Sequence, residues 1–500
     1  MSRAGNHRSQ AYRWLWLLVL PAAALLLAAT LWAMAGRLAY PYDLEWMEGG
    51  QLAHAWRLQH GRPIYPAPGP DWIPYIYPPG YSMILAALGS VVELGAPLGR
   101  AVSVVGTALA MVGIVCIVGR QGRGPDRWLA GVAAALVYLG CWRAGGAFLD
   151  LVRPDALAVG LLLVSVALSL EKRSWLQVIG GLALAGAFWV KQPMAAWGVP
   201  LVVGLIARDR SLWAAMRVGL SAAVPAGLAV LWTQWSTDGA FLTYLLGVPA
   251  SHPIIGQRLF ADPAWEWMTT LPFALALIGV GTAVAAVKRL SGGSGGRRWV
   301  LWVGFGVTAI LVSFWMRGHL GGFVNVLIPL FAFTAIGAGL MSASLSRSRV
   351  GTALVTLAFT GQLGLAWVTL DAGSLVPSIE DERAGDRIVQ ILQERQGPVF
   401  SPISPWLAVQ AGHEPGPHLI AIWDVANHPD GPWPESKAVF RQAIEERHWA
   451  VIVEGRRTMG LGIRGHYESD AAFVLGSRFR PKTGYNNRPA GLWVPKTVRP

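Results

Sequence analysis

Long apolar runs alternate with short polar connections through the first three quarters of the chain. Many runs hold about 18–22 residues without a charge, the length that crosses the hydrocarbon core of a bilayer. We expect about eleven spans, at residues 14–36, 97–119, 128–147, 156–170, 175–190, 193–207, 213–235, 268–287, 299–316, 322–342 and 350–369. The pattern therefore predicts a polytopic α-helical membrane protein.

Residues 1–13 are polar and basic and are expected to form a cytoplasmic N-terminus. The sequence Ala33-Met34-Ala35 resembles a signal-peptide cleavage site. The apolar run before it is longer than the apolar region of a typical signal peptide, so we expect a retained first span.

Residues 41–80 form the longest polar break in the first half of the chain, and three carboxylates stand at its start: Asp43, Glu45 and Glu48. Asp43 is a candidate N-cap for a helix that runs to His60. Gly61 is suited to the position just after that helix, and a proline two residues later prevents its continuation.

The apolar stretch 81–92 is either a further span or a helix on the outer surface, and the distribution of basic residues favours the second. With 81–92 on the surface, every dense basic cluster falls on the same side as the N-terminus, as the positive-inside rule requires. Those clusters lie at 120–127, 171–173, 208–210, 288–298 and 347–349. The first outer loop then covers residues 37–96 and includes juxtamembrane helices.

The transmembrane part is expected at residues 14–370, and the composition becomes polar over 371–500. This segment predicts helices at 380–396 and 436–448 and short strands at 399–401, 419–423 and 450–453. We expect a small α/β domain on the extracytoplasmic side of a bacterial inner or plasma membrane.

The composition agrees with this interpretation. Of the 500 residues 53% are hydrophobic and only 14% are charged, against about 25% in soluble domains. Many of the 25 tryptophans stand at the ends of apolar runs, as in an aromatic belt. The net charge of +13 is divided among short clusters between spans, so nucleic acid is not an expected partner.

The acidic cluster is the first candidate for chemistry, because a carboxylate at the membrane surface can act as a general base toward an acceptor. The alternative is that Asp43 only caps a helix and that Glu45 and Glu48 are solvated. Arg153 and Asp155 flank a proline in a short outer connection. They are candidates for binding an acidic group. The alternative is that the proline and the acid only begin a helix.

Further polar residues stand at the outer ends of spans. Lys191 and Gln192 lie between two apolar runs, where a lysine either contacts an anion or extends to the interface. Arg317, His319 and Asn325 stand among glycines and form either an anion or sugar contact or a simple loop. We find no metal-ligand spacing, phosphate-binding glycine loop or nucleophile elbow.

The order of these motifs resembles the GT-C glycosyltransferases, and within them the bacterial relatives of protein O-mannosyltransferases and lipid A aminoarabinose transferases. The resemblance covers roughly residues 14–340. The matching motifs are Glu48-Gly49, Arg57 to Gly61 with Pro63-Ile64-Tyr65, Tyr77-Pro78-Pro79, Arg153-Pro154-Asp155 and Lys191-Gln192. Such enzymes often carry an adjacent Asp-Glu pair, whereas the acids here are spaced apart.

The resemblance implies inverting transfer of a hexose or pentose from a polyprenyl-phosphate donor to an extracytoplasmic glycan, lipid or protein. Glu48 or Asp43 would be the base, with Glu45 the third acid of the cluster. Basic residues would hold the phosphate, with Arg57, Arg153, Lys191 and Arg317 as candidates. Tyr77 would stack on a sugar or anchor the loop. Some members use a divalent cation and others do not, so the resemblance leaves this cofactor open.

Two other classes of function fit parts of the pattern. A lipid or polysaccharide transporter would need ionisable residues in the middle of its spans, and the predicted spans carry none there. A non-catalytic membrane assembly protein would use the C-terminal domain for binding and would leave the acidic cluster in solvent.

Overall fold

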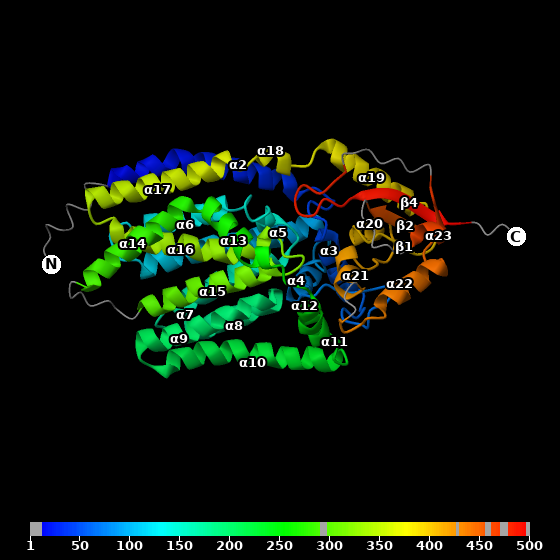
Figure 1. The fold of residues 1–500 in the computed structure, drawn as a ribbon, viewed down its shortest axis with the longest axis horizontal. Coiled ribbons are helices and arrows are strands. Elements are labelled where there is room, and N and C mark those ends of the chain that lie inside the picture. The colour runs from blue at the N-terminus through cyan, green and yellow to red at the C-terminus, as the bar shows by residue number, and fades with distance from the viewer. Residues whose placement is uncertain (1–12, 291–297, 427–429, 456–461, 471–478, 497–500) are drawn as a thin grey trace.

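Long helices run side by side along the long axis of the molecule, and a unit of strands and short helices lies at one end (Figure 1). The computed structural model describes residues 13–290, 298–426, 430–455, 462–470 and 479–496. The helices of the bundle are η1 (Arg13–Val19), α2 (Leu20–Leu38), α5 (Ala96–Gln121), α6 (Arg127–Gly140), α7 (Pro154–Ser169), α8 (Ser174–Val190), α9 (Gly198–Asp209), α10 (Leu212–Ser236), α14 (Pro272–Leu290), α15 (Arg298–Gly318), α16 (Ile328–Leu345) and α17 (Arg349–Val368).

Each apolar run that was expected to span contains one of these helices. Within the described residues, six helices are long and apolar enough to cross a membrane. They become seven if α13 (Gly256–Thr270) and α14, which meet at 89°, form one broken span. Helices α6 to α9 are only about 18–26 Å long at 1.5 Å per residue. The total of eleven spans therefore stays a prediction.

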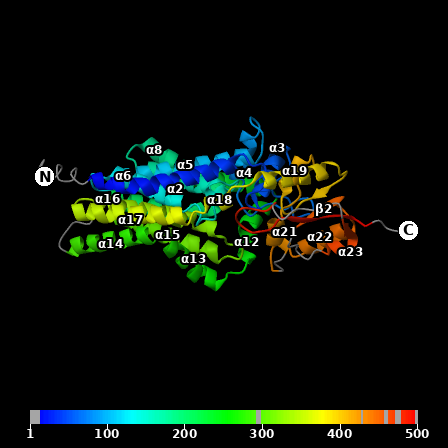
Figure 2. The same ribbon diagram turned by 90° about the horizontal axis from the view of Figure 1, so that it is seen from above.

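Short elements connect the bundle helices. They are α3 (Glu48–Gln59), α4 (Gly80–Leu88), η2 (Phe148–Asp150), η3 (Gln192–Trp197), α11 (Ala240–Leu242), η4 (Thr243–Gly247), α12 (Val248–Ser251), η5 (Val324–Leu327) and α18 (Ala372–Leu375). Helix α4 measures about 14 Å, too short to cross a bilayer. Helices α3 and α4 lie between the bundle and the C-terminal unit in both views (Figures 1 and 2).

The start of α3 differs from the prediction. The helix begins at Glu48 with Met47 at the N-cap, so the prediction that Asp43 caps it was wrong. The Glu48 carboxylate instead reaches back and accepts a hydrogen bond from the Leu44 amide. The end of the helix is as expected, because Gly61 adopts a φ of 64° just after the cap.

The C-terminal unit holds a four-stranded sheet of order β1-β2-β4-β3, with β1 (Val399–Phe400) parallel to β2 (Val451–Gly455) and the other pairs antiparallel. The remaining strands are β3 (Tyr467–Ser469) and β4 (Pro489–Pro495). The helices are α19 (Ile379–Gln393), α20 (Pro405–Gln410), α21 (Leu419–Ala426), α22 (Ser436–Glu445) and α23 (Ile463–His466).

The strand predicted at 419–423 was wrong, since these residues begin α21. The buried positions Leu419, Ile422, Val425 and Ala426 repeat every three or four residues, which is the spacing of one helix face. The first five residues alone form a short apolar run, and such a run does not distinguish a strand from a buried helix.

Among the described residues, the C-terminal unit shares its buried hydrophobic clusters with the rest of the molecule. One buried cluster joins Tyr65 and Tyr75 of the first outer loop to Phe400, Phe440 and Trp449 of the unit. A second continues from the bundle into α19 and α20. The change of composition at residue 371 is therefore not a boundary between two separate cores.

Close packing of α5 against α7 depends on two glycines. A Cβ on Gly106 would lie 2.5 Å from the Leu157 backbone, and a Cβ on Gly160 would lie 2.3 Å from the Gly106 carbonyl oxygen. Small residues allow helices to approach this closely inside membranes.

Replacing Gly106 with alanine is expected to destabilise the protein by about 1–3 kcal/mol, because the two backbones must separate. Unfolding in mixed micelles measures the effect. Gly227→Ala in α10 is the matched control, since its Cβ meets nothing within 4 Å. That variant should be neutral or stabilised by about 0.5–1 kcal/mol. Equal stabilities for the two variants would contradict this account of the packing.

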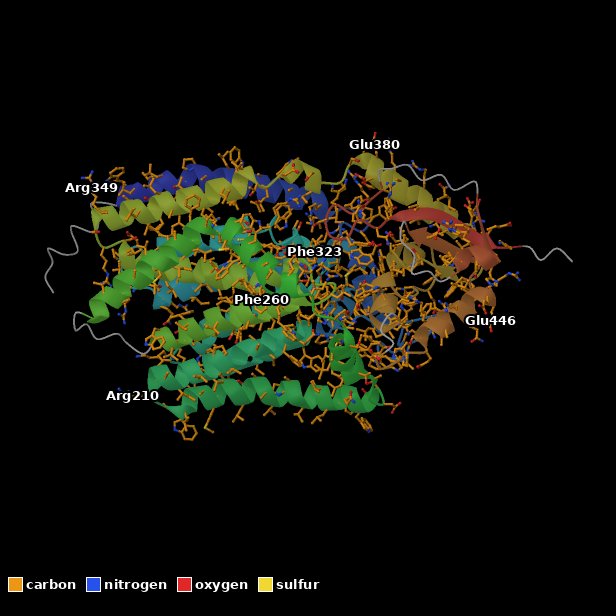
Figure 3. All side chains as sticks on the ribbon, in the orientation of Figure 1. Arg210, Phe260, Phe323, Arg349, Glu380 and Glu446 are labelled. Atoms are coloured by element: carbon orange, nitrogen blue, oxygen red, sulfur yellow. The ribbon has the colours of Figure 1, made fainter. Side chains whose placement is uncertain are left out.

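Four charged residues mark the two ends of the molecule. Arg210 and Arg349 lie at the end of the bundle far from the C-terminal unit, whereas Glu380 and Glu446 lie on that unit (Figure 3). The acidic turn before α3 lies at the same end as the unit. The two arginines and the two glutamates thus lie at opposite ends of the molecule.

Candidate active site

Glu48 is the centre of the acidic cluster and is fully buried. Its Oε1 accepts hydrogen bonds from Arg100 Nε at 3.1 Å and the Val152 amide at 2.8 Å. Its Oε2 accepts from Arg100 Nη2 at 2.9 Å and the Leu44 amide at 2.6 Å. Burial raises the pKa of Glu48, but the charge and hydrogen bonds of Arg100 outweigh it and hold the pKa below its ordinary value. An ionised carboxylate with both oxygens occupied is an anchor and a weak base.

Arg100, in the first turn of α5, fixes the turn that leads into α3. Besides Glu48, its guanidinium donates to the carbonyls of Arg37 at 2.8 Å, Tyr42 at 2.6 Å and Tyr40. The Arg37 carbonyl lies in the last turn of α2 and the other two in the non-helical stretch that follows, and such carbonyls need a partner when they are buried. Arg100 thereby determines where the acidic residues are held.

The irregular segment 141–153 lies beside this turn, and polar side chains from the bundle satisfy its backbone. Arg37 donates to the Ala147 carbonyl at 3.1 Å and pairs with Asp150 at 3.0 Å. Thr107 donates to the Leu149 carbonyl at 2.6 Å, and Ser103 donates to the Leu151 carbonyl. Non-helical backbone is tolerated at membrane depth only when it is satisfied in this way. Helix α7 starts at the end of this segment and positions Arg153 and Asp155.

Glu45 faces Arg153. The Arg153 Nη1 lies 3.5 Å from the Glu45 Oε2, and its Nη2 is 3.4 Å from the Tyr77 hydroxyl. Glu45 is 2% exposed. Burial raises the pKa of Glu45 to about 7, although the charge of Arg153 opposes the shift. Within the described residues, Nε and Nη1 of Arg153 make no hydrogen bond, and Nη1 contacts Glu45 only as an ion pair.

Asp155, Lys191 and Asn325 form a second group next to Arg153. The Asp155 Oδ1 accepts from Lys191 Nζ at 2.6 Å and from Asn325 Nδ2 at 2.8 Å. Lys191 stands where α8 ends, and Gln192 donates to the Ile76 carbonyl at 3.0 Å. Basic, acidic and amide groups from four separate parts of the chain thus meet at one end of the bundle.

Four other candidates have partners outside these two groups. Arg57 donates to the Pro63 carbonyl at 3.0 Å and stacks on Trp72, which fixes the first outer loop. Arg317 forms a two-point ion pair with Glu266, at 3.0 and 2.7 Å. His319 donates from Nε2 to the Pro249 carbonyl at 2.8 Å.

Asp43, the fourth of these candidates, lies against the C-terminal unit. Burial first, and then the charge of Glu48, raise the pKa of Asp43 well above its ordinary value, while a hydrogen bond with Ser404 opposes the rise. Its Oδ2 has no hydrogen-bond partner among the described residues. Asp43 is therefore a second carboxylate whose ordinary acidity is suppressed.

Solved structures with the same architecture identify the fold. The crystal structure of ArnT from Cupriavidus metallidurans bound to undecaprenyl phosphate matches with a TM-score of 0.58 and 13% identity, over 95% of this chain and 98% of that one. The same protein in the apo state gives 0.56 and 12%, over 94% and 97%. The chain has the GT-C fold. The fold expected from the sequence motifs is thereby confirmed.

A third structure extends the likeness. The oligosaccharyltransferase of Archaeoglobus fulgidus, tethered to an acceptor peptide, matches with a TM-score of 0.50 and 12% identity, over 87% of this chain and 69% of that one. No family model and no curated protein sequence matches the chain. At such low identity the likeness establishes the fold and leaves the chemistry to the site residues.

Within the described part of this chain, no three His, Cys, Asp or Glu side chains are arranged to hold a metal ion. The acidic residues of the site are instead paired with arginine and lysine. We therefore derive no step through a metal.

The sequence analysis did not single out Arg37 or Arg100, which hold the acidic turn. A signal was present, because Arg100, Ser103 and Thr107 recur at helical spacing and form one polar face at the start of α5. A polar stripe on an otherwise apolar span marks a face that packs against buried backbone or charge.

Proposed function

We propose that the protein transfers a sugar, a hexose or pentose, from a polyprenyl-phosphate donor to an acceptor outside the cytoplasm. The observation that carries this proposal is the buried Glu45–Arg153 pair beside the Asp155–Lys191 pair, at one end of a GT-C fold. The ArnT structure with the same fold holds undecaprenyl phosphate, and the oligosaccharyltransferase holds an acceptor peptide. Both partners are thus represented among proteins of this shape.

In the proposed reaction Glu45 removes a proton from the acceptor hydroxyl or amine. The acceptor oxygen or nitrogen then attacks the anomeric carbon, and the bond to the phosphate oxygen breaks with its electron pair on that oxygen. Arg153 and Lys191 are proposed to stabilise the resulting polyprenyl phosphate. A single displacement inverts the anomeric centre.

We prefer Glu45 to Glu48 as the base on electrostatic grounds. A general base works best with a pKa near the operating pH, and burial brings the pKa of Glu45 to about 7. Glu48 has a lowered pKa and has both oxygens occupied by Arg100 and backbone amides. Asp43 is the second candidate, because burial also raises its pKa.

The topology proposed with this function places residues 1–13 in the cytoplasm and the C-terminal unit outside. The positions of Arg210 and Arg349 support this topology, because both lie at the end of the bundle far from the C-terminal unit (Figure 3). Basic residues are typical of the cytoplasmic side. A scaffold would present its acids to solvent, whereas Glu45 and Glu48 are buried and paired. This burial favours an enzyme.

Replacing Arg153 with methionine is expected to raise the dissociation constant for undecaprenyl phosphate about 10- to 100-fold. The reason is that charge-assisted hydrogen bonds to the phosphate, worth about 1.5–3 kcal/mol, are lost. Calorimetry on purified protein measures the binding. The control is Arg62→Met, which removes an exposed arginine of the same outer loop that pairs with Glu414. Equal affinities for wild type and both variants would refute the proposed phosphate site.

A further inference from the structure

A stretch near the end of the chain returns from the C-terminal unit to the acidic turn. The amides of Lys482 and Thr483 donate to the Leu44 carbonyl at 2.8 and 3.2 Å. Glu45 and Thr483 form an isolated parallel bridge, and the Thr483 hydroxyl donates to the Gly146 carbonyl at 2.5 Å. We name residues 482–485 the return segment. It contacts both the turn that carries Glu45 and the irregular segment before Arg153.

The return segment lies directly against the Glu45 side chain at Gly484. A Cβ on Gly484 would lie 2.8 Å from the Glu45 Cγ and 2.9 Å from its Oε1. Gly484 also has a φ of 76°, in the left-handed region that favours glycine. The backbone therefore approaches the carboxylate more closely than any side chain would permit.

Neighbouring contacts hold both the return segment and the turn that carries Glu45 in place. Lys482 Nζ pairs with Asp381 at the start of α19, at 2.7 Å, which ties the return segment to the C-terminal unit. His418 accepts the Ile420 amide hydrogen bond at Nδ1, so its Nε2 carries the proton and donates to the Trp46 carbonyl at 2.8 Å. The Trp46 ring lies between His418 and Tyr485, with centroids at 4.8 and 5.0 Å.

We propose that the return segment positions Glu45 for catalysis, so that the C-terminal unit is part of the active site and not only a cover. This inference rests on the proposed sugar transfer. The turn that carries Glu45 is held by Arg100, which binds Glu48 and the Tyr42 carbonyl, and by Glu48, which accepts from the Leu44 amide. The return segment and His418 hold the same turn through the carbonyls of Leu44 and Trp46. Glu45 is thereby kept facing Arg153. Gly484 acts through Glu45 and is a positioning residue.

The test compares Gly484→Ala with Gly412→Ala in full-length purified protein. Both glycines have positive φ, 76° and 86°, so both variants carry the same backbone strain. Only the Gly484 substitution meets a neighbour, because nothing lies within 4 Å of a Cβ on Gly412. Sugar transfer from a labelled polyprenyl-phosphate donor gives kcat, KM and the pH profile, and thermal unfolding reports the fold.

We expect Gly484→Ala to lower kcat about 100-fold, the cost of displacing a reacting group by about 1 Å. The donor KM should change much less than kcat, because Lys191 stays paired with Asp155. The acid limb of the pH profile should move, since Glu45 changes its surroundings. A purely structural role would change the unfolding temperature and leave the pH profile in place.

Thr483→Val is the second variant, and it tests the positioning role if Gly484→Ala does not fold. It removes only the hydrogen bond to Gly146, so kcat should fall about 2- to 10-fold, with a shifted acid limb. Two results would overturn this inference and leave the proposed function standing. One is a wild-type kcat and pH profile in Thr483→Val. The other is a kcat and pH profile of Gly484→Ala equal to those of Gly412→Ala. Failure of wild type and Gly412→Ala to transfer any sugar would overturn the proposed function and this inference together.

Discussion

Replacing Glu45 with glutamine is expected to lower the rate of sugar transfer by about two to four orders of magnitude, the usual contribution of a general base. Glutamine keeps the size of the side chain but cannot take the acceptor proton. Donor binding should change little, because Arg153 and Lys191 remain. Initial rates with a labelled polyprenyl-phosphate sugar measure the loss, and Glu414→Gln on the exposed surface is the control.

The pH dependence gives this prediction a second, independent measurement. The base must be deprotonated to act, so kcat/KM of wild type should rise with pH and level off above about 7, where burial places the pKa of Glu45. The residual activity of Glu45→Gln should lack this limb. If Asp43→Asn loses transfer while Glu45→Gln retains it, Asp43 is the base and the assignment to Glu45 is wrong.

Replacing Arg100 with methionine is expected to destabilise the protein by about 3–5 kcal/mol, as when one partner of a buried ion pair is removed. Glu48 would be left as an uncompensated buried charge, and the carbonyls of Arg37, Tyr40 and Tyr42 would lose their donor. Unfolding in mixed micelles measures the change, and the folded fraction in membranes should fall with it.

Arg120→Met is the matched control, because Arg120 lies on the same helix and also forms an ion pair. That pair, with Glu171, has exposed side chains, 46% and 30% by relative area. An exposed pair contributes about 0–1 kcal/mol, so the variant should stay close to wild type. A similar loss in both variants would mean that removal of any α5 arginine is harmful. The buried network would then have no special role.

The sequence predicts well what depends on local pattern. The apolar runs contain the bundle helices, Gly61 ends α3 in the positive-φ conformation, and the short length of α4 follows from the polar and proline residues around it. The motifs around Arg153 and Lys191 were also singled out from the sequence. In the structure Arg153 pairs with Glu45, and Lys191 pairs with Asp155 two residues after Arg153.

What the sequence did not predict depends on contacts between distant segments. Arg100 pairs with Glu48 from 52 positions away, and no local rule connects them. Thr483 contacts Glu45 from the far end of the chain. From the sequence, Glu48 or Asp43 was expected to be the base. Burial, neighbouring charge and hydrogen bonding instead separate Glu48, with its lowered pKa, from Glu45, with its raised pKa.

The central claim is a single displacement at the anomeric carbon of a polyprenyl-phosphate sugar. The most direct test is the anomeric configuration of the product that wild-type protein forms, determined by NMR from donors of known configuration and a panel of acceptors. Our account predicts turnover with inversion, together with release of free polyprenyl phosphate. Retention of configuration, or no turnover of any donor by folded protein that binds undecaprenyl phosphate, would contradict it.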